Sequence, residues 1–584
     1  MRKRFESIVS MLPALRHGPG FAMRQTFAEG YGIAKLRADV LAGIVVGIVA
    51  LPLSMALAIA SGVPPQHGLY TAIGAGAAIA LLGGSRVQVS GPTAAFVVIL
   101  APIAARFGLG GLCLATLMAG VILVGMGLGR LGQMVSFIPY PVTTGFTAGI
   151  AVVIATLQLK DFLGLDTGPL PSAFIEKVGT IARAVPTAHW PDALVGAFTL
   201  ALLLLWPRVT RRIPAPLVAI TAGAAGAWIL EKLWPGTFSV ATIGTRFSAV
   251  IDGKPVAGIP QLPPLPLLPW RLPGPNGEPL VLNLELFRAL IGPAFAIAML
   301  GAIESLLSAV VADGMTGMKH DSDAELMAQG VGNILAPFLG GFAATGAIAR
   351  TATNVRSGGR SPIAAVVHAL FVLAAVIAAA PLLAYLPMAS MAALLLLVAW
   401  NMSEVKHFVR MVRTAPQSDV AVLLTCFGLT VAFDMVIAVS VGIVLAALLF
   451  IRRMAEVSSV RLVGSEHRVD AVGLPPTVVL YEIAGPLFFG AAQKAMSSLR
   501  TVEQGVQVVV LDMRDVPAMD ATGLVNLEST VDRLESQQVY VVLAGVQAQP
   551  RRVLAKGGLA GDDRLAVCSG FDEAIEIAKR RVST

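Results

Sequence analysis

A succession of apolar runs between Val40 and Ile451 constrains the fold of this chain more than any other feature. A transmembrane helix needs about 20 predominantly apolar residues, and most of the runs approach that length. Hydrophobic residues make up 56% of the 584 residues and charged residues only 13%, which is about half the charge of a typical soluble chain. The composition therefore excludes a soluble enzyme, a nucleic-acid-binding protein and a disordered scaffold.

We count fourteen apolar runs, which predict an α-helical polytopic membrane protein with fourteen transmembrane segments. They lie near residues 40–60, 68–83, 92–105, 111–130, 141–160, 191–206, 215–232, 288–312, 326–340, 346–357, 361–380, 386–401, 417–432 and 434–451. Two of these runs, 92–105 and 346–357, are too short to cross a bilayer as straight helices.

A proline-rich, sparsely charged stretch at 234–287 divides the predicted transmembrane domain, 39–453, into two halves of seven runs. We interpret this stretch as an outward-facing loop. Because seven is odd, the halves 39–233 and 288–453 must have opposite topology. Inverted repeats of this kind are a common plan for secondary transporters.

Basic residues predict the orientation, because cytoplasmic loops carry an excess of Lys and Arg. They follow the even-numbered runs, at Arg86, Arg130, Arg208, Arg211, Arg212, Arg356, Arg360, Lys406, Arg410, Arg413, Arg452 and Arg453. Residues 1–38 are polar and basic and contain no cleavable signal peptide. We therefore expect a cytoplasmic N-terminal arm, a cytoplasmic C-terminus and a location in a bacterial inner membrane.

The composition changes after Arg453. Strand-like segments near 478–483, 506–513 and 539–546 alternate with helical stretches near 489–501, 521–536 and 570–581. This alternation predicts a small α/β domain at 454–584. It contains no run of membrane length, so we expect it to be cytoplasmic.

The two short runs occupy matching places, each third in its half. The first begins with Gly91-Pro92-Thr93-Ala94-Ala95, and the second contains Thr345-Gly346-Ala347. Paired broken helices are the sequence pointer to a transporter's binding site. A helix N-terminus carries free N–H groups and a partial positive charge, so two of them facing each other favour an anion. The alternative is that both are glycine-rich packing segments.

Arg350 lies inside the second short run, six residues before Arg356. A charged residue within a membrane segment costs about 2.5–3.5 kcal/mol on insertion scales and indicates a functional site. A guanidinium that points inward offers a planar fork to a carboxylate or oxyanion. The alternative is that Arg350 extends to the cytoplasmic surface beside Arg356.

Glu304 is the second unusual charge, because it lies within the apolar helix predicted at 294–311. A carboxyl group there can gain and lose a proton as its surroundings change, as a proton-coupled transporter requires. The alternative is a structural ion pair, or a hydrogen bond to the backbone of a broken helix. We interpret Asp434 as an interfacial residue at the end of its run.

The sequence resembles the SulP family of anion transporters over nearly its whole length. The resemblance is carried by segments 41–57, 61–70, 84–95, 301–319, 333–341 and 347–360. It implies seven plus seven inverted segments, divided into core and gate domains, followed by a cytoplasmic STAS domain. It also implies a substrate site between the third and tenth segments, and a homodimer.

The resemblance places several residues in a predicted site. Arg350 matches an arginine that many members hold beside the anion, and Ala349 occupies the adjacent position. Thr93 stands at the start of the third segment, and Glu304 matches an acidic position associated with proton coupling. We include three more residues in the predicted substrate site: Ala94, Thr351 and Ser54.

Within the family, segments 94–100, 297–319, 391–404 and 433–449 resemble the bacterial DauA-type C4-dicarboxylic acid transporters. This implies proton-coupled uptake of succinate, fumarate or aspartate. Sulfate and bicarbonate, the latter with Na⁺ as coupling ion, are alternatives within the family. Leu53 and Leu57 depart from the animal anion exchangers, which argues against chloride exchange.

The stretch 508–523 resembles the STAS signature, a strand and a turn followed by a helix. Either Asp520 or Thr522 could cap that helix. Thr522 matches a position that is phosphorylated in STAS domains of sigma-factor regulators, which implies a regulatory site and a cytosolic protein partner. The alternative is that Thr522 only caps the helix.

Two functions remain open: a secondary-active anion transporter, and a membrane sensor that signals through its STAS domain. Paired broken helices with Arg350 and Glu304 favour transport, since a sensor needs no proton acceptor in mid-membrane. An enzyme is disfavoured, because the sequence has no HExxH or GxSxG motif, and the lack of a Walker A motif leaves ATP-driven transport unsupported. The three cysteines, without CxxC spacing, indicate neither a metal site nor disulfides. We expect no cofactor, no metal and no nucleic acid. The expected partners are a small anion, protons or Na⁺, and lipid.

Overall fold

A computed structural model describes residues 18–583, except 136–137, 172, 211–212, 252–253, 434, 458, 463–473, 489–491, 494–495, 497–504 and 562. Asp434, Arg211, Arg212, residues 1–17 of the predicted arm and most of the helix predicted at 489–501 lie outside the described residues. The described part of the arm contains α3 (Phe21–Ala28) and the start of α4 at Ile33. The chain forms two compact units, which we call the membrane unit (Met1–Ile443) and the C-terminal unit (Val444–Thr584). The domain boundaries expected from the sequence remain predictions.

Each of the fourteen predicted runs coincides with a helix or half-helix of the structure. Among the described residues, nine helices are long and apolar enough to cross a membrane. One of them, α6, consists of two predicted segments joined at a kink at Gly108, where φ is +68°. Glycine adopts such a conformation without strain. The third predicted run is therefore a half-helix that ends at this kink.

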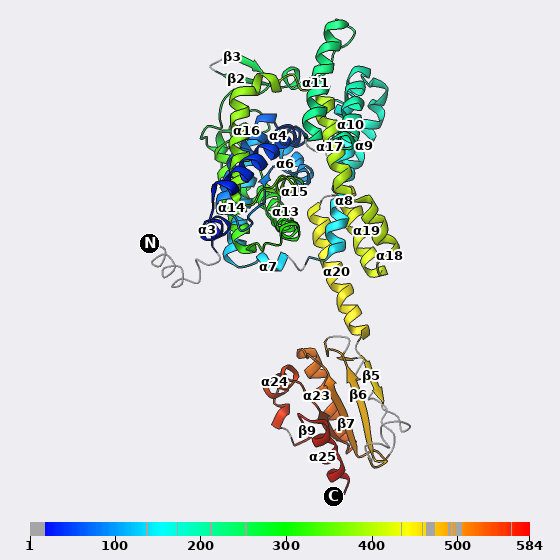
Figure 1. Cartoon of the computed structure of the whole chain (residues 1–584). Coiled ribbons are helices and arrows are strands. Elements are labelled where there is room, and N and C mark those ends of the chain that lie inside the picture. Colours follow the sequence, from blue (N-terminus) through cyan, green and yellow to red (C-terminus); the bar gives the residue numbers. More distant parts are fainter. Residues whose placement is uncertain are drawn as a thin grey trace. The chain divides into compact units, whose positions relative to one another are not determined.

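The helices of the membrane unit pack in two groups (Figure 1). The core group consists of α4 (Ile33–Ala60), α5 (Pro65–Leu82), α6 (Ala94–Leu128), α13 (Leu284–Thr316), α14 (Ser322–Phe338), α15 (Ile348–Arg356) and α16 (Pro362–Leu383). The gate group consists of α8 (Tyr140–Phe162), α10 (Trp190–Val209), α11 (Ala215–Leu233), α17 (Met388–Ser403), α19 (Gln417–Ala432) and the first part of α20 (Met435–Val457), which belongs to the C-terminal unit from Val444 on. With α6 counted as two, the first four segments of each half form the core and the last three form the gate.

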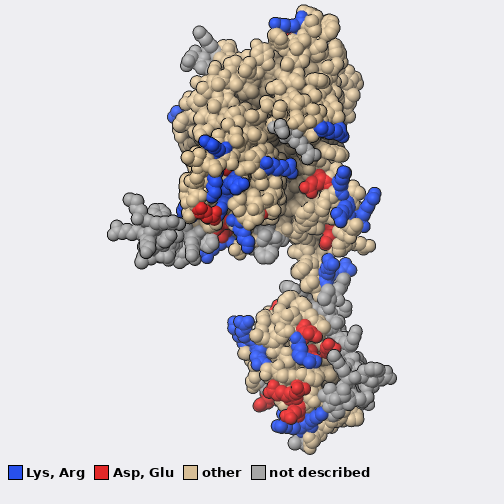
Figure 2. Space-filling view, viewed as in Figure 1, with Lys and Arg blue, Asp and Glu red and all other residues tan. Residues whose placement is uncertain are grey.

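The surface of the membrane unit matches this architecture. Figure 2 shows large areas of its visible face without charged side chains, and most of the Lys, Arg, Asp and Glu residues gathered toward the lower part of that unit. Exposed leucine, isoleucine, valine and phenylalanine side chains are spread along the long helices, as a lipid-facing surface requires.

The proline-rich stretch 234–287 is more ordered than the predicted loop. It contains a one-turn helix, α12 (Ile243–Arg246), and a hairpin of β2 (Ser248–Ile251) and β3 (Lys254–Ala257). Its backbone also binds the ends of membrane helices: Met388 donates to Ala241, Leu267 donates to Phe338, and Gly110 donates to Pro273. The stretch therefore ties together helix ends of both groups.

The C-terminal unit contains a five-stranded sheet in the order β5-β6-β7-β8-β9. The edge strand β5 is antiparallel to β6, and the other neighbours are parallel. The strands are β5 (Ser459–Leu462), β6 (Val478–Ala484), β7 (Val508–Asp515), β8 (Tyr540–Ala544) and β9 (Leu565–Val567). The helices whose full bounds lie within the described residues after the first strand are α23 (Ala521–Ser536), α24 (Ala548–Lys556) and α25 (Phe571–Ser583). The three predicted strands are confirmed, whereas β5, β9 and α24 escaped prediction.

Alternating side chains of the central strands cover the two faces of this sheet. Val509 and Leu511 pack on the face that carries α23 and α24. Val508 and Val510 pack on the opposite face against α25. The C-terminal unit thus has a core on both sides of its sheet.

Candidate anion site

The two predicted half-helices meet through a two-residue strand pair. Ser90 and Gly91 form β1, and Thr345 and Gly346 form β4; the strands are antiparallel, with Ser90 opposite Gly346. Each strand leads into a half-helix, because α6 begins at Ala94 and α15 begins at Ile348. Crossed strands of this kind bring two helix N-termini together, although 254 residues separate the helix starts in the sequence (348 − 94).

The N-termini of both half-helices lack a side-chain cap. Thr93 and Ala347 occupy the N-cap positions, and neither side chain accepts from the first-turn N–H groups. These N–H groups are electropositive donors. The arrangement therefore provides two uncapped helix starts beside each other, as the sequence predicts for an anion site.

Arg350 joins the two half-helices. It lies on α15 and is 1% exposed, and its Nη2 donates to the carbonyl oxygen of Pro92, directly before α6. It therefore does not extend to the membrane surface beside Arg356, which is exposed. Among the described residues, its Nε and Nη1 have no hydrogen-bond partner. Buried donors normally have one, so two guanidinium nitrogens, with three N–H groups between them, are free to bind a ligand.

Gly91 makes room for this guanidinium. A Cβ atom at Gly91 would lie 2.6 Å from Nη1 of Arg350. His368 of α16 is also fully buried. The described neighbours of the Arg350 guanidinium are thus a glycine and a backbone carbonyl, and no described carboxylate forms an ion pair with it.

Glu304 lies on α13 and binds the first half-helix. Its Oε2 accepts a hydrogen bond of 3.0 Å from Oγ1 of Thr93. Among the described residues, Thr93 is its hydrogen-bond partner and no Lys or Arg forms an ion pair with it. The structure therefore shows Glu304 in a hydrogen bond with a threonine and not in an ion pair with a described residue. A titratable carboxyl group stands at the start of α6, on the same half-helix whose preceding carbonyl binds Arg350.

The other predicted substrate residues differ in their surroundings. Ala349 is exposed in the first turn of α15, and Ala94 is buried in the first turn of α6. The hydroxyl of Thr351 is engaged, because it accepts from the backbone N–H of Val89 at 3.1 Å and lies 3.2 Å from Oγ of Ser308. Ser54 lies on α4, which packs against α15, and its buried Oγ has no partner among the described residues.

Sequence reasoning missed a row of polar residues on α14 that holds the strand crossing. Glu325 accepts from Gln88 at 2.9 Å and from the backbone of Gly84 and Ser85. Gln329 donates to Glu325 and to Ser90. Asn333 binds the backbone of Ala344 in both directions, at 2.8 and 2.9 Å. We call Glu325, Gln329 and Asn333 the α14 ladder; their spacing of four residues was the available signal.

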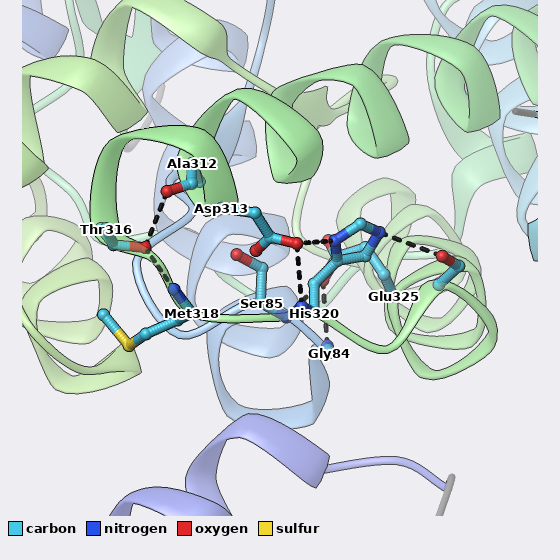
Figure 3. Close-up of polar contacts among 9 residues, drawn as sticks. Gly84, Ser85, Ala312, Asp313, Thr316, Met318, His320 and Glu325 are labelled. Atoms are coloured by element: carbon cyan, nitrogen blue, oxygen red, sulfur yellow. Dashed lines mark hydrogen bonds and ion pairs between the residues drawn. The ribbon is translucent and has the colours of Figure 1, made fainter.

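A second polar cluster closes the turn between α13 and α14. Figure 3 shows Asp313 and His320 pointing toward one another, with 2.7 Å between Oδ2 and Nδ1, next to the hydrogen bonds of Glu325 to Gly84 and Ser85. The backbone N–H of His320 donates to the same Asp313 oxygen. This cluster fixes the start of α14, and thereby the α14 ladder.

The serine hydroxyls of α13 support the second crossing strand. Oγ of Ser305 lies 2.6 Å from Oγ1 of Thr345 and accepts from the N–H of Gly346 at 3.0 Å. Oγ1 of Thr345 also donates to the carbonyl of Gly301. Two consecutive residues of α13 therefore serve both half-helices: Glu304 binds Thr93 before α6, and Ser305 binds β4 before α15.

In the C-terminal unit, Asp520 caps α23. Its Oδ1 accepts from the N–H of Gly523 at 2.7 Å. Thr522 is half-buried in the first turn, and its carbonyl accepts from Asn526. Of the two predicted cap residues, Asp520 holds the position, and a regulatory role of Thr522 remains a prediction.

Comparisons with known proteins agree with this architecture. The model of the sulfate permease family matches residues 36–426, and that of the STAS domain matches residues 470–568. The putative sulfate transporter YvdB of Bacillus subtilis is 41% identical, over 91% of this chain and 95% of its own. The bicarbonate transporter BicA of Picosynechococcus is 29% identical, over 89% of this chain and 90% of its own.

The fold also matches a solved structure. The structure of SLC26A9 superposes with a TM-score of 0.82 at 18% sequence identity, and covers 100% of this chain and 96% of that one. At that identity the likeness concerns the fold, including the seven-plus-seven arrangement of the membrane segments. Since the family model covers most of the chain, the protein belongs to the sulfate permease (SulP) family of anion transporters and carries a C-terminal STAS domain.

Proposed function

We propose that this protein is a secondary-active transporter that takes up a small oxyanion together with a proton, and that the anion binds where the two half-helices meet. The observation that carries the proposal is the guanidinium of Arg350, which is buried at the start of α6 with two nitrogens, Nε and Nη1, free of described partners. A guanidinium binds an oxyanion through parallel hydrogen bonds. Two uncapped helix N-termini add positive potential at the same place.

Sulfate is the substrate that we propose first. The relative at 41% identity is named as a putative sulfate transporter, and the relative at 29% is named for bicarbonate. The resemblance of several segments to C4-dicarboxylate transporters keeps succinate, fumarate and aspartate as a second candidate class. All of these anions present two or more oxygen acceptors to the same donors.

Arg350 tests the binding site. We expect Arg350→Ala to abolish uptake of labelled sulfate into proteoliposomes, because a hydrogen bond to a charged group contributes about 1.5–3 kcal/mol and two are lost. Arg350→Lys keeps the charge without the planar fork and should restore little uptake. Arg356→Gln on the same helix is the matched control and should transport normally. Normal uptake by Arg350→Ala would remove Arg350 from the site.

Glu304 is the residue that we propose for proton coupling, since its carboxyl group lies at the start of α6 and faces Thr93. In Glu304→Gln, an inward proton gradient should no longer accelerate uptake, whereas exchange of labelled for unlabelled anion should continue. Glu285→Gln, at the exposed start of the same helix, is the control. Gradient-driven uptake that survives in Glu304→Gln, or that follows Na⁺ instead, would contradict proton coupling through this residue.

A substrate panel separates the candidate anions. Unlabelled sulfate, bicarbonate, succinate, fumarate and aspartate compete with labelled sulfate in the same vesicles. Preferential inhibition by succinate would favour the dicarboxylate class, and preferential inhibition by bicarbonate would favour the bicarbonate alternative. A purified protein that accumulates none of them would favour the sensor alternative.

We further propose a bacterial inner-membrane location with both termini in the cytoplasm, and a homodimer. The basic residues after even-numbered segments support the orientation, and the family resemblance supports the dimer. Labelling of single cysteines from either side of intact vesicles tests the orientation.

A further inference from the structure

Helix α18 (Val405–Thr414) is a short basic helix to which the proposed transport function gives no role. It follows α17 after a sharp turn at Glu404, whose backbone is left-handed (φ 41°, ψ 43°), so it does not continue the axis of α17. Ten residues of helix span about 15 Å, which is half of a bilayer core. Figure 1 shows α18 beside α19, at the lower part of the membrane unit.

One face of α18 packs against two other helices of the membrane unit, α8 and α19. His407 lies 2.9 Å from the hydroxyl of Tyr140 at the start of α8. The ring of Phe408 packs against Phe427 of α19, with ring centroids 5.4 Å apart. Met411 is half-buried on the same side. The orientation of the helix is therefore fixed by neighbours from two other helices.

The remaining two faces of α18 are exposed and differ in character. Val405, Val409 and Val412 form an apolar stripe, and they are 41%, 39% and 37% exposed. Lys406, Arg410 and Arg413 form a parallel stripe of exposed cations. Both stripes follow the spacing i, i+4, i+7 that places residues on one helix face. Among the described residues, none of the three cations forms an ion pair, and α18 itself contains no acidic residue.

We propose that α18 lies in the membrane interface and binds the phosphate groups of anionic phospholipids. A helix with an apolar stripe beside a basic one, over its whole length, fits the boundary between acyl chains and headgroups. The valines contact the acyl region, and the three cations meet phosphates one helical turn apart. An acidic protein surface would match the cations but would leave the valine stripe in water.

A lipid bound to α18 would act on the gate group, because α18 packs against two helices of that group. Through His407 and Phe408, the helix touches the start of α8 and the middle of α19. An anionic lipid held by α18 is therefore attached to the gate group rather than to the core group.

Native mass spectrometry of the full-length protein with added phosphatidylglycerol tests the proposal. We expect Lys406→Gln/Arg410→Gln/Arg413→Gln to bind phosphatidylglycerol at least about tenfold more weakly, since each basic residue near an anionic surface contributes up to about a fivefold effect. Arg410→Lys/Arg413→Lys keeps the charge and should keep binding. The matched control, Lys35→Gln/Arg37→Gln/Arg356→Gln, removes three cations elsewhere and should change binding by less than about twofold.

Two additional arms identify the ligand. Phosphatidylcholine should bind the native protein weakly, and sn-glycerol 3-phosphate should not displace phosphatidylglycerol, because it lacks the acyl chains that the valines contact. Val409→Ser/Val412→Ser should weaken lipid binding with all cations present. Equal affinity in the triple variant and its control overturns the proposal. So does loss of dimer mass in the triple variant with lipid binding unchanged, because α18 would then be a protein interface.

Discussion

The guanidinium of Arg350 lies so close to Gly91 that there is no room for a side chain at position 91. We predict that Gly91→Ala raises the apparent KM for anion uptake by roughly tenfold or more. A Cβ there would lie 2.6 Å from Nη1, which forces the guanidinium away from the two helix starts, and misplacement by about 1 Å can cost about 100-fold in function. The measurement is a concentration series of labelled sulfate uptake.

Gly125 provides the control for this substitution. It lies on the second half of α6, and a Cβ there would meet nothing within 4 Å. Gly125→Ala should therefore transport normally. If Gly91→Ala also leaves the KM unchanged, the close approach of Gly91 and Arg350 has no part in anion binding.

At the scale of single residues, the sequence shows which charged residues are unusual, but it does not show which residues they contact. Arg350 and Glu304 could be singled out because each lies within an apolar run. That Arg350 binds the carbonyl of Pro92, 258 positions earlier, could not be predicted, since it depends on how the two halves cross. Thr351 was chosen for its place in the short run, but its hydroxyl is directed to Val89 and Ser308. Its role in substrate binding remains a prediction.

Among the secondary-structure elements, the strands β1 and β4 are the shortest parts of the site. Each has two residues, and four residues of ladder cannot hold two half-helices in place. The α14 ladder supplies the missing contacts through side chains, because Gln329 binds Ser90 and Asn333 binds Ala344. The stability of the crossing therefore depends on a helix that touches no proposed substrate atom.

We predict that Asn333→Leu destabilises the membrane unit and slows transport. The amide is fully buried, accepts from the N–H of Ala344 and donates to its carbonyl. A buried polar group that loses its partner costs about 1–3 kcal/mol, so a loss of roughly 3 kcal/mol is expected for the two groups. The measurement is the midpoint of thermal unfolding in detergent, together with uptake.

Asn401, exposed at the end of α17, is the comparison for this substitution. Asn401→Leu should leave both the unfolding midpoint and uptake nearly unchanged. An unfolding midpoint of Asn333→Leu equal to that of the native protein would mean that β1 and β4 stand without the α14 ladder.

Helices of this fold could be predicted because lipid imposes a simple rule: each crossing must satisfy its backbone internally and expose apolar side chains. The fourteen runs follow from that rule alone. The strands β1 and β4 are too short to produce a periodic pattern. Helix α14 contains Gln329 and Asn333 inside the apolar run predicted at 326–340, and Glu325 directly before it. When a polar residue binds backbone that is distant in the sequence, the residues around it do not indicate which group it binds.

For the molecule as a whole, the division into two helix groups is the feature that relates fold to transport. The hydrogen bonds of Arg350, Glu304 and the α14 ladder lie within the core group. Thr199 binds Ser390 within the gate group, and Tyr140 binds His407 beside it. Each group thus has polar contacts of its own, which fits movement of one group against the other around the anion, as in other inverted-repeat transporters.

The C-terminal unit should fold and unfold as an independent domain, because its sheet has a buried core on both faces and it forms a compact unit separate from the membrane unit. We predict that a fragment of residues 454–584, which omits the apolar part of α20, unfolds cooperatively in urea. Leu511→Ala should lower its free energy of unfolding by about 3 kcal/mol, because this side chain is fully buried in the centre of the sheet. Val525→Ala, at a position 58% exposed, should change it by less than about 0.5 kcal/mol.

The same substitution in the full-length protein distinguishes independent units from a single cooperative one. If the units are independent, Leu511→Ala lowers only the unfolding transition of the C-terminal unit, and the thermal midpoint of the membrane unit in detergent stays where it is. Substitutions at separate, non-contacting sites act independently, so in the combined variant Asn333→Leu and Leu511→Ala should each shift the transition of their own unit by as much as they do alone. A membrane-unit midpoint that falls with Leu511→Ala would mean that the STAS domain stabilises the transporter, and that the two units share one folding transition.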